Sequence, residues 1–433
     1  MHHSLSLWSA IRININIMLG TGLFINTVNL ARMAGPFGAF SYAVVGIILF
    51  PLIITIARLV ELHPQGGFYR FGSYEISPLA GFLSAWIYFA GKLASATLMI
   101  HASSTLLRIL IPALTGMHHL LLDTLVIICF ALLNLCNMKM GNTIQALFFN
   151  AKMVPIALIL GIAMLWYKPS NYAPYIVGLE NFIATLPIVL YATIGFEAAC
   201  SLSGRLENPR INGPRAILVS YSVLLAVYCF FQAGLYGLLG SQLASLHSFA
   251  DVFQAVTAFL PESMQMLTAT LLTACVALSA LGGAYGILFS NMWNLHALAE
   301  HDHVWGAAWL KKLSVHKVPL WCVAAEGLLC CSYLWLSGGI QLPLQQISGL
   351  GSVIAYTISC IAAYYAKKRG DLRLSWAFIG IALINCCMLI TVCMATLIKG
   401  GSLTLYLFIG LIILGISMFF RCKSVSRINR AIH

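Results

Sequence analysis

About twelve stretches of roughly 20 apolar residues recur along the sequence, and this recurrence restricts the fold more than any other feature. An α-helix needs about 20 apolar residues to cross the ~30 Å hydrocarbon layer of a bilayer. Only 8% of the 433 residues are charged and 60% are hydrophobic, whereas a soluble domain has about 25% charged residues. We therefore predict an all-α membrane protein with about twelve transmembrane helices. Their ranges are 10–32, 37–60, 78–104, 121–138, 143–167, 181–202, 215–240, 265–290, 318–337, 344–366, 375–398 and 402–420.

Lysines and arginines are distributed asymmetrically between the segments that connect these helices. When twelve helices are threaded from a cytoplasmic N-terminus, 18 of the 24 Lys and Arg fall in cytoplasmic segments. Four fall outside, and Lys92 and Lys152 fall within helices. Cytoplasmic loops of membrane proteins show this enrichment. The net charge of +12 therefore predicts a multi-pass protein of the cell (inner) membrane with both termini cytoplasmic, and it does not indicate nucleic-acid binding.

Glycines interrupt two of the predicted helices near their middle. Residues 20–22 (Gly-Thr-Gly) break the first helix, and Gly195 and Phe196 break the sixth beside Glu197. A break in mid-membrane leaves N–H groups without helical partners on one side and C=O groups on the other. The N–H end suits a carboxylate and the C=O end suits an ammonium group, so two facing breaks can bind a zwitterion mainly through backbone atoms.

Interrupted helices at corresponding positions of two five-helix halves are typical of transporters built from inverted repeats. We therefore predict a single transmembrane transporter domain over residues 1–433. Repeat one covers about 8–168, repeat two covers about 180–368, and two additional helices cover about 374–420.

Several ionisable residues lie within the predicted helices, where charge is costly and usually functional, and four of them are considered: Lys152, Glu197, Lys92 and Glu326. Lys152 is interpreted in two ways: as an ammonium that stands where a coupling cation would bind and exchanges a proton, or as a structural tie to nearby carbonyls. Glu197 is a gate or proton carrier, or it holds the unwound backbone open. For Lys92 we predict structural pairing, and Glu326 is expected to face a partner helix.

The 13 cysteines and 12 histidines lack the spacing of a metal site. A closed zinc site needs three or four convergent ligands, and most of the cysteines lie in apolar stretches, where cysteine packs as a small hydrophobe. We therefore predict neither a metal ion nor a cofactor. A membrane-embedded enzyme, one alternative class, would require His101 or His296 beside a polar catalytic partner.

A series of motifs along almost the whole chain resembles the amino acid–polyamine–organocation (APC) permease superfamily, and in particular its bacterial amino acid permeases and antiporters. They are residues 18–24 (MLGTGLF), 34–36 (AGP), 61–62 (EL), 64–69 (PQGGFY), 77–82 (SPLAGF), 191–197 (YATIGFE), 207–209 (ENP) and 213–217 (GPRAI). The resemblance implies a leucine-transporter-like fold of five plus five helices with two more at the C-terminus.

The resemblance also implies roles for individual residues around the two breaks. The amides of Thr21 and Gly22 would hold a substrate carboxylate, with Gly20 allowing close approach. The carbonyls of Met18, Tyr191 and Ile194 would hold the substrate ammonium group.

Two further residues of the sixth helix and one of the fifth complete the implied site. Gly195 would allow its unwinding, and Phe196, together with Tyr191, would close over the substrate. Lys152 matches a fifth-helix lysine of members that work without sodium. Two departures from the family pattern concern Asn16, where a glycine is usual, and Trp293, near the position of an expected arginine; the second bears on the inner gate.

The sequence thus predicts secondary active transport of amino acids by alternating access, sodium-independent, either as proton-coupled symport or as amino acid exchange. The expected partners are an amino acid, the lipid bilayer and, as a candidate coupling ion, the proton. A polyamine or organic cation antiporter of the same fold is the main alternative, and a proton-channelling subunit is another. Candidates for the residues that contact the substrate side chain are Ser279, Ser290, Asn291 and Ser352.

Overall fold

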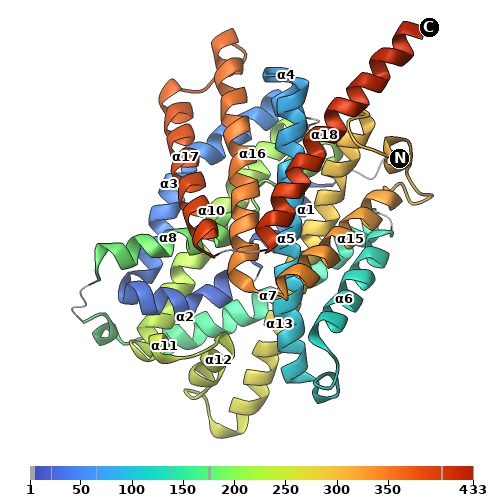
Figure 1. The fold of residues 1–433 in the computed structure, drawn as a ribbon. Coiled ribbons are helices and arrows are strands. Elements are labelled where there is room, and N and C mark those ends of the chain that lie inside the picture. The colour runs from blue at the N-terminus through green and yellow to red at the C-terminus, as the bar shows by residue number, and fades with distance from the viewer. Residues whose placement is uncertain are drawn as a thin grey trace.

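The computed structural model describes residues 5–20, 22–64, 66–136, 138–173, 177–400 and 403–432. Helices make up nearly all of this part of the chain, and no strand is formed in it beyond one isolated bridge. The α-helices are α1 (Leu7–Met18), α2 (Gly22–Ala34), α3 (Gly38–Leu62), α4 (Phe68–Glu75), α5 (Pro78–Leu110), α6 (His119–Asn134), α7 (Met138–Leu165), α8 (Leu179–Thr193), α9 (Ala198–Leu202), α10 (Pro209–Leu239), α11 (Gln242–Ser245), α12 (Phe249–Thr257), α13 (Glu262–Glu300), α14 (Ala307–Leu310), α15 (Leu320–Ser337), α16 (Gln341–Arg369), α17 (Trp376–Gly400) and α18 (Leu403–Ile432) (Figure 1).

Within the described residues, ten helical segments are long and apolar enough to cross a membrane, and α6 is a shorter apolar helix. One of the ten, Gly22–Leu62, contains both α2 and α3, which are joined by the short 3-10 turn Gly35–Phe37. The predicted all-α membrane fold is confirmed. The count of twelve helices and the division into two inverted repeats stay predictions.

Both predicted helix breaks are present in the structure. Helix α1 ends at Met18 and α2 begins at Gly22, and α8 ends at Thr193 while α9 begins at Ala198. Gly195 adopts a φ of +124°, and a Cβ at this position would lie 3.0 Å from Met18 Cγ. Glycine is required here because L-residues rarely adopt this backbone conformation. Thr21 lies outside the described residues.

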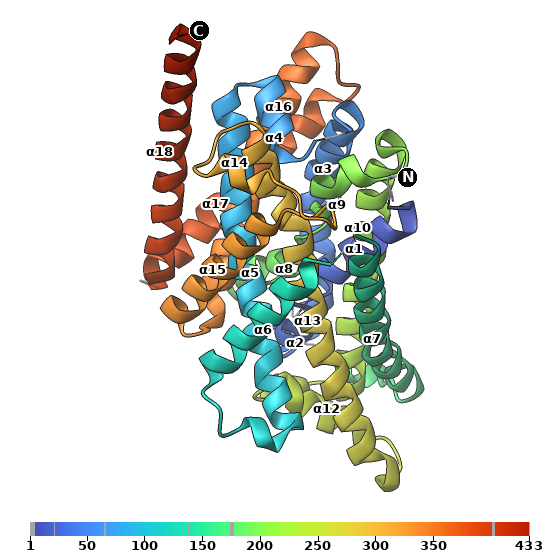
Figure 2. The same ribbon diagram turned by 90° about the vertical axis from the view of Figure 1, so that its right-hand side faces the viewer.

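Helix α5 forms the centre of the molecule, packing against α13 on one side and α16 on another (Figure 2). The approach of α5 and α16 depends on a pair of glycines. A Cβ on Gly91 would lie 2.9 Å from the Cα of Gly351, and one on Gly351 would lie 2.8 Å from the Cα of Gly91. Small residues let membrane helices pack backbone to backbone in this way.

Loops and the N-terminal segment close one end of the bundle, and both chain termini lie in the upper half of Figure 1. Leu5 pairs with Leu206 in the isolated β-bridge, which fastens the start of the chain to the segment after α9. The buried carboxylate of Glu75 contacts His63 (2.6 Å between Nε2 and Oε1) and Arg369 at the end of α16. The sequence predicts that this end is cytoplasmic.

Replacing Gly91 with valine is expected to destabilise the fold, because the new side chain would meet the backbone of α16. Overpacking of a close contact costs about 1–3 kcal/mol, and we expect a lower unfolding temperature of the purified protein in detergent. Gly380→Val in α17 is the matched control, since a Cβ there meets nothing within 4 Å. Equal unfolding temperatures for the two variants would contradict this role of the glycine pair.

Candidate functional site at two helix breaks

A small closed cavity lies where the two helix breaks face each other. Its free volume is about 10 Å³, about the room that one water molecule needs. The walls come from α1, α2, α5, α8 and α13 and the break after α8, so segments far apart in the sequence meet at this point. The lining residues are Ile17, Met18, Gly22, Lys92, Ser95, Met99, Tyr191, Ala192, Ile194 and Ile287.

Lys152 holds the open carbonyl end of α1. Its ammonium group donates to the carbonyl oxygens of Asn16 and Leu19, each at 2.7 Å, and the side chain is fully buried. The Ser279 hydroxyl donates to the same Leu19 oxygen at 3.1 Å. These donors satisfy carbonyls that a continuous helix would have paired internally.

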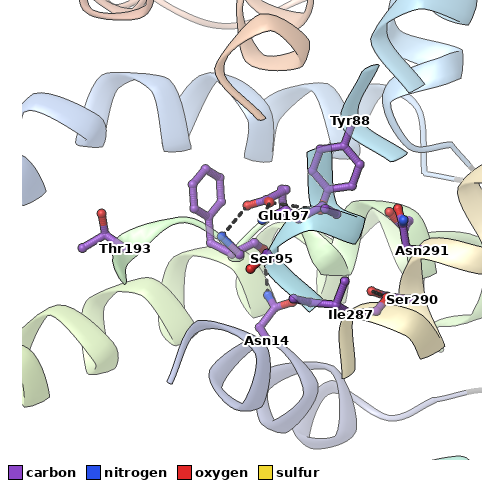
Figure 3. A network of polar contacts seen from close by, with 12 residues as sticks. Asn14, Tyr88, Ser95, Thr193, Glu197, Ile287, Ser290 and Asn291 are labelled. Carbon is purple, nitrogen blue, oxygen red and sulfur yellow. Dashed lines mark hydrogen bonds and ion pairs between the residues drawn. The ribbon is translucent and has the colours of Figure 1, made fainter. Parts of the chain in front are cut away.

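Glu197 holds the break between α8 and α9. Its Oε1 lies 2.7 Å from Lys92 Nζ and accepts a hydrogen bond from the Tyr88 hydroxyl at 3.0 Å. Its Oε2 accepts from the backbone N–H of Gly195 at 2.8 Å. Figure 3 shows Glu197 between Tyr88 on α5 and the unwound segment. The pairing predicted for Lys92 is therefore present, and its partner is the carboxylate of the break.

Asn14 connects the two broken helices directly. From α1, its Nδ2 donates to the Phe196 carbonyl at 2.8 Å and its Oδ1 accepts from the Ala199 N–H at 2.9 Å. The Asn14 side chain thus provides a donor for one free carbonyl of the second break and an acceptor for one free N–H. Figure 3 shows Asn14 beside this break. Such pairing is required because an unsatisfied backbone group in a membrane interior costs several kcal/mol, roughly.

Tyr228 of α10 also connects the two breaks. Its hydroxyl oxygen lies 2.7 Å from the carbonyl oxygen of Met18 and 2.7 Å from that of Ala192. The ring is fully buried and stacks on Tyr42, with 4.9 Å between centroids. One of the carbonyls predicted to hold a substrate ammonium, that of Met18, therefore has a hydroxyl beside it.

Most of the site residues predicted from the sequence lie at the two helix breaks. Some of them line the cavity and others lie beside it. Met18, Gly22, Tyr191 and Ile194 are on its wall. The others adjoin the breaks: Gly20 packs against the Met99 thioether, Glu197 accepts from the Gly195 N–H, and Lys152 donates to backbone carbonyls of the first break. Phe196 stacks on Tyr356, with 5.5 Å between ring centroids. The substrate-binding roles of all these residues stay predictions.

Sequence reasoning did not find Asn14, Tyr88 or Tyr228. The first is one of several asparagines near the start of the chain, and the two tyrosines are among 17 in the sequence. No local pattern distinguishes them, because their function in the structure depends on partners in other helices.

The two departures from the family pattern each have a structural counterpart. Asn16 Nδ2 donates to the carbonyl of Gly282 at 3.0 Å and also contacts Gln145. Trp293 makes a cation–π contact with Arg205, whose guanidinium carbon lies 4.2 Å from the Trp293 ring centroid. The arginine that follows α9 thus contacts the position where an arginine was expected on α13.

The two histidines considered for an intramembrane enzyme lie away from the breaks. His101 Nδ1 is 2.7 Å from Asp123 Oδ2, and its side chain lines a separate cavity of about 460 Å³. His296 Nε2 is 3.4 Å from Glu300. Among the residues that the structure describes, no three or more His, Cys, Asp or Glu side chains are grouped as a metal site would require.

The sequence profile of the amino acid permease family matches residues 5–419. The chain belongs to the amino acid permease family. Its named relatives are transporters and permeases of the APC superfamily, so the chain is a transporter and not an enzyme.

Three relatives of this permease illustrate the range of the family. The aspartate–proton symporter of Bacillus subtilis (strain 168) is 26% identical over 54% of this chain and 48% of its own length. The D-serine/D-alanine/glycine transporter of Escherichia coli (strain K12) is 25% identical over 82% of this chain and 78% of its own length. A branched-chain amino acid permease of Bacillus subtilis (strain 168) is 22% identical over 94% and 90%.

Glu197→Gln is expected to destabilise the permease strongly, because it leaves the Lys92 ammonium buried without a carboxylate. Removing one partner of a buried ion pair costs about 3–5 kcal/mol, which thermal unfolding in detergent would detect. Glu61→Gln is the matched control, because Glu61 pairs with Arg58 at the surface with about half of each side chain exposed, where pairs contribute about 0–1 kcal/mol.

The double variant Lys92→Met/Glu197→Gln separates the ion pair from the shape of the site. It removes both charges, so its unfolding temperature is expected to exceed that of Glu197→Gln alone. If the double variant unfolds at a lower temperature than the single one, the loss does not arise from an unpaired lysine.

Proposed function

We propose that this permease is a secondary transporter that carries amino acids across the cytoplasmic membrane by alternating access. The observation that supports this most is the pair of breaks meeting at one cavity. Gly22 at the start of α2 lines this cavity together with Met18 at the end of α1, Tyr191 of α8 and Ile194 in the second break. Alternating access would require one group of helices to move relative to the other around this fixed site.

The two ends suit the two charges of an amino acid. The beginning of a helix offers unpaired N–H groups and a partial positive charge, which favour a carboxylate. The carbonyls of Met18, Tyr191 and Ile194, residues that line the same cavity, would favour an ammonium group. Because the closed cavity has room for little more than a water molecule, substrate entry would require Met99 and neighbouring side chains to move.

Sodium-independent transport is the form of coupling that we propose. The Lys152 ammonium already contacts the carbonyl oxygens of Asn16 and Leu19 at the break, and these oxygens are the kind of ligand that a sodium ion would need. Proton symport and amino acid exchange are both compatible with a lysine there. We propose that both termini lie in the cytoplasm, because the segments predicted on that side carry the excess of Lys and Arg.

A polyamine or other dication fits this site less well than an amino acid does. Such a substrate would need carboxylates on the cavity wall. The one carboxylate at the breaks, that of Glu197, has Lys92, Tyr88 and the Gly195 N–H as partners and is fully buried.

Uptake into proteoliposomes tests the proposal with a panel of labelled amino acids and polyamines. Each is measured with a sodium gradient, with a pH gradient, and with unlabelled amino acid inside. We expect uptake of at least one amino acid, without stimulation by sodium. Sodium-driven uptake would contradict the role given to Lys152, and absence of any amino acid uptake would overturn the proposed function.

Lys152→Ala is expected to reduce coupled uptake at least about tenfold, because two carbonyls at the first break lose the charged donor that holds them. Ser332→Ala on α15 is the control and is expected to retain most activity, since that hydroxyl bonds to the Leu328 carbonyl of its own helix and lies outside the breaks. Normal uptake by a folded Lys152→Ala variant would reduce Lys152 to a structural tie.

A further inference from the structure

Among the described residues that line the cavity between the breaks, Lys92 is the one with a charged side chain. It lies on α5, where Ser95 and Met99 follow at helical spacing on the same face and line the same cavity. Only 3% of Lys92 is exposed, so its side chain is held within the protein, on the wall of the cavity where the proposed substrate would bind. Figure 3 shows Ser95 and Ile287 in the same region.

In the ion pair of Lys92 and Glu197, the carboxylate has more hydrogen-bond partners than the ammonium group. Glu197 has three donors around its two oxygens: Lys92, the Tyr88 hydroxyl and the Gly195 N–H. An ammonium group has three protons to donate, and one contact at 2.7 Å to Glu197 uses one of them. Lys92 can therefore donate to a further acceptor within the cavity while keeping its ion pair.

The ionisable side chains around the breaks differ in where they lie relative to the cavity. Lys152 bonds the Asn16 and Leu19 carbonyls, and Glu197 is surrounded by its own donors. Neither of them, nor Glu326 on α15, is among the residues that line the cavity. A carboxylate that enters a buried site needs a cationic partner, and Lys92 on the cavity wall can supply one.

The orientation of the substrate directs its side chain toward α5. If the α-carboxylate occupies the Gly22 end and the α-ammonium group the carbonyl ends, helices α1, α2 and α8 are used by the main-chain groups. The remaining wall consists of Lys92, Ser95 and Met99 on α5 and Ile287 on α13. Of these, only the Lys92 ammonium can pair with a side-chain charge.

We propose that Lys92 determines substrate specificity, and that this permease prefers amino acids whose side chain carries a carboxylate. The proposal rests on the proposed function, because it assumes that an amino acid binds at the two breaks. It adds the substrate class: the side-chain carboxylate binds the Lys92 ammonium, which stays paired with Glu197.

Pairs of substrates with the same shape and different charge test the proposal. The initial uptake of labelled aspartate is compared with that of asparagine, and glutamate with glutamine, in proteoliposomes of the full-length protein. For the wild type we expect kcat/KM for the acid to exceed that for its amide at least about tenfold in one pair. Ratios of one or below in both pairs would overturn the proposal.

Variants identify the residue responsible for the preference. In Lys92→Met the acid-to-amide ratio is expected to fall to about one or below, and in Lys92→Arg it is expected to stay above one. Thr97→Val on another face of α5, where Thr97 bonds to the Leu93 and Cys330 carbonyls, is expected to keep the wild-type ratio. A Lys92→Met ratio equal to that of the wild type would overturn the proposal.

The possible results distinguish failure of this inference from failure of the proposed function. Should Lys92→Met fail to fold, the wild-type ratios and Lys92→Arg still decide the question. Uptake of neutral amino acids without preference for acids would overturn this inference and leave the proposed function intact, whereas absence of all amino acid uptake would overturn both.

Discussion

Backbone groups exposed in mid-membrane are the constraint on which this structure depends. The break between α1 and α2 and the break between α8 and α9 leave peptide N–H and C=O groups without helical partners, at a depth where no bulk water can satisfy them. Five side chains from other elements or from the break itself meet this need: Asn14, Lys152, Glu197, Tyr228 and Ser279. The packing of α1, α7, α10 and α13 around the breaks follows, since each of these helices carries one of the required partners.

The Lys92–Glu197 pair joins the central helix α5 to the unwound segment. Buried ion pairs often add little net stability, because desolvating both charges offsets their attraction. Their better attested use is to fix one arrangement among several, and here the arrangement that is fixed is the conformation of residues 194–197. The same ammonium lies on the cavity wall, so one residue both holds the break and provides a charge to the site.

The sequence was sufficient for the membrane fold and for the positions of the breaks. Long apolar stretches and the glycines of residues 20–22 and 195 are local signals, and Glu197 and Lys152 were marked by the cost of charge within a span. The partners of the breaks could not be predicted in the same way. Lys152 and Leu19 are 133 residues apart, and Ser279 and Leu19 are 260 apart. Which side chain reaches which carbonyl depends on the relative rotation of whole helices, which local sequence does not encode.

The position of Tyr228 makes one hydroxyl serve both broken helices. A hydroxyl has one proton, and the carbonyl oxygens of Met18 and Ala192 each lie 2.7 Å from its oxygen, so at any moment one of them lacks that proton. A group with several N–H protons on one atom would serve both carbonyls at once, and it would join the ends of α1 and α8 more completely than a single hydroxyl does.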